Sequence, residues 1–271
     1  MTSRRWVFRE LCVAAGKHVL VQKPMAVDFA TADRMIAIAA NAGIQLGVVS
    51  QHRFDDATLF LKRAIAEGRL GRIFQADAYV KWFRSAEYYS RPGKGSWAVE
   101  GGGALINQAI HQVDLLLHLI GSVTRVYGEW QLGSLHAIES EDLHSSTLRY
   151  ASGATGILQC STAMWPGYPE RIEIHGTKGT AIVTADKLTT WDVAGDSGED
   201  PPISAQNGSG ASDPMAISTI SFERQFLDFA AACGGARAPA SSGLDGRRAL
   251  QLVLAADESC RSTQPIEVRV N

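Results

Sequence analysis

The chain of 271 residues lacks several features that mark special classes of protein. Its four cysteines are far apart and form no C-x-x-C pair, which argues against a disulfide framework or a zinc module. No apolar run approaches the roughly 20 residues that span a membrane as a helix. The net charge of −2 argues against a dedicated nucleic-acid binder or a membrane-surface protein. With 45% hydrophobic and 20% charged residues, the composition is that of a soluble globular enzyme, which we expect to be cytoplasmic.

The first 50 residues alternate between helices and short buried strands. The pattern predicts helices over 4–15 and 31–42, and strands over 18–22 and 45–50. Gly16 and Gly43 follow the two helices, as glycine commonly does at helix C-termini. This alternation is typical of a parallel sheet with helices on its faces.

We expect only a remnant of a doubly wound domain, in which a parallel sheet carries helices on both faces. Two strands are too few for it, and the motif G-x-G-x-x-G, which binds phosphate groups between a strand and a helix, is absent. The nearest approach, Gly208-Ser209-Gly210, follows no strand. The strand over 18–22 would also expose an unpaired hydrophobic edge, which native proteins avoid. We therefore expect either that a preceding segment is missing, through a truncated gene or expressed fragment, or that a partner covers this edge.

From residue 53 onwards the pattern predicts a different architecture. Strands are expected over 73–83, 123–132, 143–150, 154–163, 170–175, 180–185 and 266–270, and helices over 56–67, 218–233 and 244–262. Gly176-Thr177-Lys178-Gly179 is predicted to be a hairpin turn, and the polar residues 195–214 a mobile loop. The expected fold class is mixed α/β and α+β. The remnant of a parallel sheet is followed by a larger domain with an open, mostly antiparallel sheet covered by helices on one face.

Three glycines, at 101–103, lead into a further predicted helix that ends at Gly121. At helical spacing its apolar residues share one side and its polar residues lie beside them: Ile106, Ile110, Val113 and Leu117, then Asn107, His111, Asp114 and His118. An imidazole with an amide one turn earlier and a carboxylate three residues later is a plausible proton-handling group. The alternative is that these polar side chains simply face water.

After His111, Lys23 is the second candidate for a catalytic residue. It lies at the C-terminal end of a predicted parallel strand, where open α/β sheets bind their ligands. Pro24 fixes the following backbone and favours an extended conformation for Lys23, which directs the ammonium group. The alternative is that Lys23 is an ordinary solvated charge.

Together these stretches resemble the Gfo/Idh/MocA family of NAD(P)-dependent sugar and polyol oxidoreductases. The resemblance depends on residues 15–24, A-G-K-H-V-L-V-Q-K-P, and on the glycine-led helix with its I-H-x-x-D sequence at 110–114. Lesser matches lie at 51–54, 70–71, 95–97 and 175–179. The order and spacing of these pieces, which span roughly residues 10–185, make the resemblance specific for the family but not for a substrate.

The resemblance implies that residues 1–52 are the C-terminal part of a Rossmann-type dinucleotide-binding domain. Residues 53–271 would then form the substrate-binding and oligomerisation domain. The implied reaction is hydride transfer between NAD or NADP and a secondary alcohol of a sugar, polyol or cyclic diol. A homodimer or homotetramer would form through the open sheet, where Tyr127 and Trp130 are available.

The resemblance also assigns roles to residues. Lys23 would bind the reacting hydroxyl near the nicotinamide, and His111 would act as the acid/base. The remaining implied positions are Gln22, Pro24 and Gln51 beside Lys23 for the cofactor, and Trp97, Asn107, Asp114 and Tyr168 for the substrate. Asp114 could orient His111 from the next turn, or pair locally.

Three departures from the family pattern matter. Gln22 replaces the usual glutamate, and Asn107 stands where several members carry an aspartate, so His111 would lose a charged partner. The missing glycine motif predicts that this chain alone binds dinucleotide weakly or not at all. Calorimetry that measures a micromolar affinity for NAD(H) or NADP(H) would refute this expectation.

Two other classes of function remain open. His111, Asp114 and His118 have a spacing that could supply three ligands of a metal-dependent hydrolase or isomerase, which metal analysis would decide. The chain could also be a non-catalytic family member that acts as a sheet-mediated oligomer or binding protein. A stable monomer in chromatography would count against that reading.

Overall fold

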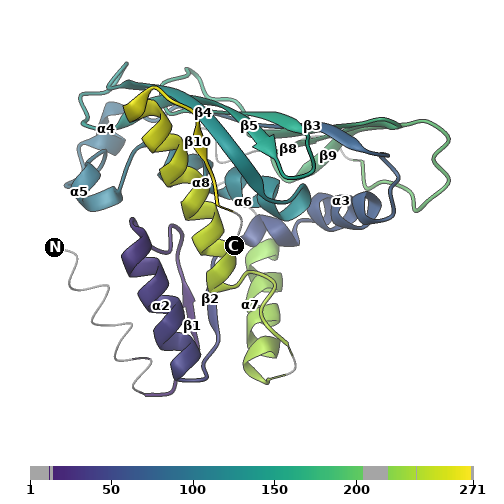
Figure 1. The fold of residues 1–271 in the computed structure, drawn as a ribbon, viewed down its shortest axis with the longest axis horizontal. Helices are drawn as coiled ribbons and strands as arrows, with labels where there is room; N and C mark the ends of the chain where they lie inside the picture. The colour runs from purple at the N-terminus through teal and green to yellow at the C-terminus, as the bar shows by residue number, and fades with distance from the viewer. Residues whose placement is uncertain (1–11, 13–14, 204–218, 236, 270–271) are drawn as a thin grey trace.

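The computed structural model describes residue 12 and residues 15–203, 219–235 and 237–269. The predicted helix over 4–15 and much of the predicted loop over 195–214 therefore lie outside the described residues. The chain forms a two-stranded sheet and an eight-stranded sheet, with α8 (Gly243–Ser262) running between them (Figure 1). None of the described helices is both long enough and apolar enough to cross a lipid bilayer.

The small sheet consists of two parallel strands joined by a helix. β1 (Val19–Val21) pairs in parallel with β2 (Leu46–Val48), and α2 (Phe29–Asn41) connects them. The side chain of Asp28 accepts a hydrogen bond of 2.7 Å from the backbone N–H of Thr31, so the helix begins earlier than its apolar pattern predicts. The predicted helix–strand alternation of this region is confirmed.

The large sheet has the strand order β10-β4-β5-β6-β3-β7-β8-β9. Its members are β3 (Ile73–Lys81), β4 (Val123–Leu132), β5 (Glu141–Tyr150), β6 (Thr155–Ser161), β7 (Arg171–Gly176), β8 (Gly179–Thr184), β9 (Lys187–Val193) and β10 (Ile266–Glu267). Only β3 and β6 pair in parallel. The mostly antiparallel sheet and the hairpin turn between β7 and β8 are as predicted. β9 was not predicted; its Trp191 is buried against Phe60, with ring centroids 5.0 Å apart.

Helices cover one face of this sheet, as expected (Figure 1). They are α3 (Asp56–Ala66), α6 (Ile110–Leu119) and α8, and their apolar sides meet the inward residues of the strands in one continuous core. Leu116 of α6, Leu158 of β6 and Leu250 of α8 are completely buried there. Four short helices lie in the connections: η1 (Gln51–Phe54), α4 (Ala86–Tyr89), α5 (Trp97–Glu100) and the π-helical turn η2 (Leu105–Ala109).

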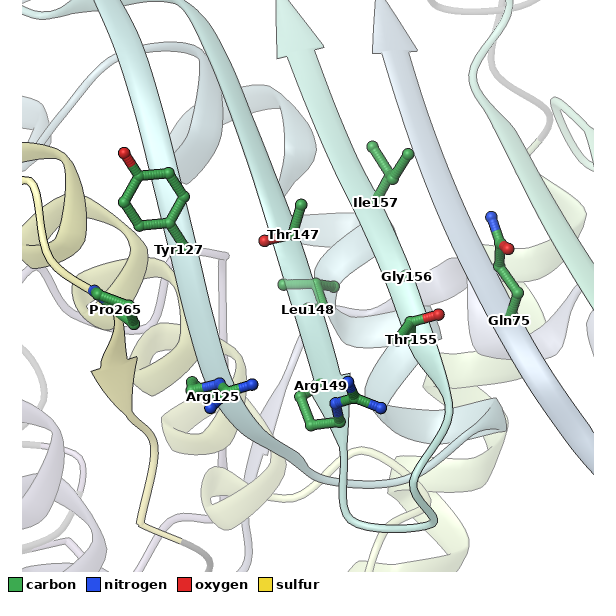
Figure 2. Close-up of a pocket in the computed structure, with 10 residues that line it drawn as sticks. All are labelled: Gln75, Arg125, Tyr127, Thr147, Leu148, Arg149, Thr155, Gly156, Ile157 and Pro265. Carbon is green, nitrogen blue, oxygen red and sulfur yellow. The ribbon is translucent and has the colours of Figure 1, made fainter.

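The other face of the sheet is open. Arg125, Tyr127, Thr147 and Ile157 project from β4, β5 and β6 on this side (Figure 2). Trp130 does not, which corrects the expectation that both aromatic residues of β4 lie on the open face. Side chains alternate along a strand, so residues three apart point to opposite faces. The Trp130 ring lies 5.4 Å from that of Trp97 and beneath Arg261 of α8.

The C-terminal part of the chain returns to the small sheet. The backbone N–H of Val48 donates to the carbonyl of Ser241 at 3.1 Å. The buried Gln225 of α7 (Ile220–Cys233) donates to the carbonyl of Val48 and accepts from the N–H of Ser50. Ser241 and Gln225 thus bind the backbone at the end of β2, although they lie far beyond residue 52. The division of the chain into two domains at residue 52 stays a prediction.

Candidate active site

Lys23 follows β1 and reaches across to the glycine-led segment. Its Nζ atom donates a hydrogen bond of 2.5 Å to the carbonyl oxygen of Asn107 in η2. Burial and the positive charge of Lys94 lower the pKa of Lys23 to about 8, although the carboxylate of Glu100 acts in the opposite direction. The Lys23–Pro24 peptide bond is cis. Lys23 is therefore held at the junction of the two sheets rather than solvated at a loop tip.

The three glycines allow the backbone to approach β5 closely. Gly101 and Gly102 have φ angles of 78° and 156°, which side chains disfavour. A Cβ atom at Gly103 would lie only 1.8 Å from the carbonyl oxygen of Glu141. The Glu141 carboxylate accepts hydrogen bonds from the N–H groups of Gly103 and Leu105, at 2.8 and 2.9 Å. Glu141 thereby fixes the start of the segment that carries Asn107 and His111.

The helix after the glycines is not the uninterrupted α-helix that the spacing predicts. Its first turn, η2, is π-helical, and the regular helix α6 begins at Ile110. The Asn107 side chain turns back and donates to the carbonyls of Gly102 and Gly103, at 3.0 and 3.1 Å. One-turn π segments occur often at functional sites. Here the segment leaves the Asn107 carbonyl in contact with Lys23.

His111 is the second residue of α6 and is partly exposed. Its ring meets that of His52 edge-on, with centroids 5.3 Å apart. Burial, followed by the positive charge of Lys23 and the neighbouring His52, lowers the pKa of His111 well below its usual value of 6.5. The imidazole is therefore neutral at neutral pH and able to accept a proton. Lys23 and His111 are thus near enough to interact electrostatically, and their shared role at a substrate hydroxyl stays a prediction.

The carboxylate of Asp114 forms an ion pair with Arg53. Its two carboxylate oxygens accept hydrogen bonds of 2.7 and 2.6 Å from the guanidinium group of Arg53, and both side chains are buried. This bidentate pair ties α6 to η1. This pair is neither of the two roles weighed for Asp114, because Arg53 is a distant residue in the chain, 61 positions earlier, and the pair does not involve His111.

The three proposed metal ligands on this helix do not form a cluster. The Asp114 carboxylate pairs with Arg53, and burial together with the charges of Arg53 and Lys62 lowers the pKa of His118 to about 4. Within the described ranges, the side chains whose ligand atoms do lie within 4.8 Å of one another are Asp77, Glu173 and His175. Those three residues project from β3 and β7 and belong to the large sheet.

Residues 84–100, a connection rich in aromatic and charged side chains, border the site on another side. Among them the sequence singles out only residues 95–97. The amide nitrogen of Gln108 lies 3.3 Å from the Tyr88 hydroxyl, and the Lys94 ammonium lies 5.0 Å from the centre of the Tyr88 ring. Lys94 also pairs with Glu100. Arg84 and Lys94 both lower the pKa of Lys23. The signal in the sequence was the density of aromatic and charged residues just before the glycines.

Trp97 and Tyr168 lie in different surroundings. The Trp97 indole donates to the Glu139 carbonyl, packs at a tilt against Trp130 and lies against Gly102, so it supports the glycine turn. The backbone N–H of Tyr168 donates to the carbonyl of Lys81 at 2.7 Å, while its ring is exposed. Their roles as pocket residues stay predictions.

Gln22 and Gln51 lie at the carboxyl ends of the two parallel strands. The exposed Gln22 accepts a hydrogen bond of 3.1 Å from the backbone N–H of Lys23. Gln51 is 2% exposed, yet its side-chain carbonyl oxygen has no hydrogen-bond partner among the described residues. A buried acceptor without a donor is costly, so this oxygen is suited to a ligand that donates.

Comparisons with known proteins agree with this architecture. Residues 58–182 match the GFO/IDH/MocA C-terminal domain. The chain is 26% identical to a myo-inositol 2-dehydrogenase of Thermotoga maritima over 268 residues, covering 95% of this chain and 74% of that protein. It is 29% identical to a D-apiose dehydrogenase of Paraburkholderia graminis over 271 residues, covering 96% and 69%.

A solved structure extends the match to three dimensions. The WlbA dehydrogenase of Bordetella pertussis, in complex with NADH and UDP-GlcNAcA, superposes with a TM-score of 0.86 at 30% identity. The alignment covers 98% of this chain and 76% of that one. Fold and relatives together define an oxidoreductase with a helix-covered antiparallel sheet. The chain belongs to the Gfo/Idh/MocA family.

Proposed function

We propose that this protein transfers a hydride between NAD or NADP and a secondary alcohol of a sugar, polyol or cyclic diol. The observation that supports this proposal is the contact between the Lys23 ammonium and the Asn107 carbonyl, four residues before His111. It brings a cation and a neutral imidazole to one place. The relatives named above include dehydrogenases of myo-inositol and D-apiose, which are a cyclic polyol and a sugar.

The two residues have complementary roles in this reaction. His111 removes the proton of the substrate hydroxyl while the hydride leaves the same carbon atom. Lys23, in its ammonium form, stabilises the negative charge that develops on the alcohol oxygen. In the reverse direction, His111 returns the proton to the alkoxide. The neutral state of His111 and the charged state of Lys23 coexist near neutral pH, because one pKa lies well below 6.5 and the other at about 8.

The residues at the carboxyl ends of β1 and β2 fit a nicotinamide group. The orphaned side-chain oxygen of Gln51 is an acceptor for an amide donor, and a nicotinamide carries a carboxamide. Gln22, Lys23 and Pro24 would hold the cofactor beside it, since ligands of parallel sheets bind at this edge. The bound cofactor supplies the hydride acceptor, while the protein orients the alcohol.

The four residues that we expect to act on the substrate side lie in different parts of the site. Asn107 and Trp97 border the glycine turn, so we retain them as residues that shape the substrate pocket. Tyr168 is retained as an exposed residue that a substrate would cover. Asp114 contributes by holding α6 against η1 through Arg53.

We also propose that the protein assembles as a homodimer or homotetramer through the open sheet face. A groove of about 620 Å³ crosses β3, β4, β5 and β6 there, lined by Arg125, Tyr127 and Ile157 among others (Figure 2). Ile157 is 38% exposed in the single chain, and a second copy would cover it.

A panel of sugars, linear polyols and cyclic diols, tested with NAD and NADP, examines the proposed reaction. We expect turnover of at least one alcohol, and we expect Lys23→Met and His111→Gln each to lower kcat by about 10²-fold or more. His175→Gln, on the large sheet away from this site, is the matched control and should leave kcat unchanged. Absence of turnover at cofactor concentrations at which calorimetry shows NAD or NADP bound to the chain would support the non-catalytic alternative.

A further inference from the structure

A second histidine stands behind His111. His52 lies in η1, and its ring contacts the His111 ring at an interplanar angle of 86°. Its Nδ1 atom lies 2.8 Å from a carboxylate oxygen of Asp55. The other oxygen of Asp55 accepts a hydrogen bond from the Ser221 hydroxyl of α7. The ring of His111 is thus in edge-on contact with that of His52, and hydrogen bonds continue from His52 through Asp55 to Ser221.

The position of Asp55 shows that its carboxylate is directed at His52. Asp55 is the N-cap residue of α3, where an aspartate side chain ordinarily accepts a hydrogen bond from the first turn of the helix. Its carboxylate makes no such bond. It is buried and turned towards His52 and Ser221 instead. Because the Asp55 carboxylate contacts the His52 imidazole and does not cap α3, we infer that its role extends beyond the stability of this helix.

The two rings differ in their affinity for a proton. Burial disfavours the charged form of His52, but the hydrogen bond and charge of Asp55, with Glu170 and Asp186, outweigh this effect and raise its pKa. The groups that face His111 are Lys23 and His52, and both oppose its protonation. A proton taken up by His111 therefore has a more favourable site next to it.

We propose that His52 and Asp55 form a proton relay behind His111, an inference that rests on the proposed dehydrogenase function. As the hydride leaves the alcohol carbon for the nicotinamide, the hydroxyl proton moves to His111. His111 then gives this proton to Nε2 of His52, while Asp55 keeps the proton on Nδ1. His52 finally releases this proton from Nε2 to water and becomes neutral again, since 13% of its side chain is accessible. Alcohol reduction runs the same steps in reverse.

The relay explains how the site exchanges protons during turnover. His52 lies on another element, η1, and 13% of its side chain is accessible, so it can provide a route to solvent for the proton. His52 is thus a positioning residue that acts through His111.

Histidine NMR titration of the full chain tests the electrostatic part without cofactor. We expect His52 to titrate above the usual 6.5, and we expect Asp55→Asn to lower its pKa. His52→Gln should raise the pKa of His111, because it removes an opposing charge. A His52 that titrates at or below 6.5, or a His111 that titrates identically in His52→Gln, would overturn the proposal whether or not the chain turns over.

Kinetics with the best alcohol of the panel test the relay itself. We expect His52→Gln to lower kcat about tenfold with little change in KM, to increase the solvent deuterium isotope effect, and to recover in part on addition of imidazole. Asp55→Asn should have a smaller effect in the same direction. His175→Gln is the control. If Asp55→Asn does not fold, Ser221→Ala replaces it, because this variant removes only the hydrogen bond that Ser221 donates to Asp55. Wild-type turnover with an unchanged kcat in His52→Gln would refute the relay but not the dehydrogenase assignment, whereas a wild type that binds cofactor and yet turns over no alcohol would refute that assignment.

Discussion

The lowered pKa of Lys23 results from its burial and from the charges around it. Burial lowers its pKa first, and the cations Lys94 and Arg84 lower it further, while Glu100 opposes them. The ammonium form is the one that stabilises an alkoxide. Alcohol oxidation is therefore expected to decline as the pH rises through about 8, where Lys23 loses its proton.

Replacing Lys94 with Gln tests this cause. Removal of the Lys94 charge relieves a repulsion and leaves the Glu100 carboxylate without its partner, so the pKa of Lys23 rises. The alkaline limb of kcat/KM for alcohol oxidation should move to higher pH. The profile between pH 6 and 10, compared with that of Lys187→Gln, measures the effect. An alkaline limb at the same pH in both variants would contradict the assigned role of Lys94.

Asp257 supplies a second prediction for a single residue. It is 1% exposed, one of its oxygens has no hydrogen-bond partner among the described residues, and burial and Glu141 raise its pKa to about 8. The folded state thus holds a proton that the unfolded chain releases near pH 4. Between these values Asp257 lowers stability as the pH rises, because the folded state binds more protons.

Asp257→Asn should therefore become more stable relative to the wild type as the pH rises. The difference in unfolding free energy is expected to grow by about 1 kcal/mol for each pH unit between 5.5 and 7.5. Urea unfolding of both proteins at several pH values gives this difference directly, and the titration of groups that do not interact with Asp257 cancels in it. A difference independent of pH would show that Asp257 is ionised in the folded protein.

At the scale of elements, the site depends on how the glycine turn, η2 and α6 are held. The glycines and the position of His111 could be predicted from the sequence because both are local signals. The π-helical turn could not, because it depends on Glu141, 38 residues away in β5. The partner of Asp114 was missed for the same reason, since Arg53 lies 61 residues earlier in the chain.

Gly103→Ala tests whether the close approach to β5 builds the site. A Cβ atom at this position meets the backbone of Glu141, which cannot move without disturbing the large sheet. We expect a loss of about 3 kcal/mol or more of stability, the upper part of the range for overpacking, together with loss of turnover. Gly234→Ala is the control, because a Cβ atom there meets only the Ala231 carbonyl at 3.3 Å. Equal thermal stability of the two variants would contradict this account.

For the whole molecule, the periodicity of the sequence was sufficient to predict the two kinds of sheet. A short parallel unit and a long antiparallel sheet differ in local pattern, and both were recognised. The arrangement between them was not predictable, because it depends on contacts such as those of Gln225 with Val48 and Ser50. β9 was missed because its sequence, KLTTWDV, is mostly polar and only Leu188 and Trp191 are buried.

Assembly through the open face is a property of the whole molecule and has its own test. Ile157→Lys places a charge among the residues that line the groove in Figure 2 and should dissociate the oligomer into monomers. Leu244→Lys changes a comparably exposed residue of α8 and should leave the oligomer intact. Sedimentation velocity distinguishes the two. A wild-type chain that is monomeric at micromolar concentration would refute the assembly.

The convergence of Lys23 and His111 on one alcohol is tested most directly by a crystal structure with reduced cofactor and the alcohol that the panel selects. We expect one hydroxyl oxygen to lie within hydrogen-bonding distance of both the Lys23 ammonium and the His111 ring. Its carbon atom should face the nicotinamide. An alcohol bound between Tyr88 and Lys94, with its reacting hydroxyl in contact with neither Lys23 nor His111, would contradict the proposed mechanism.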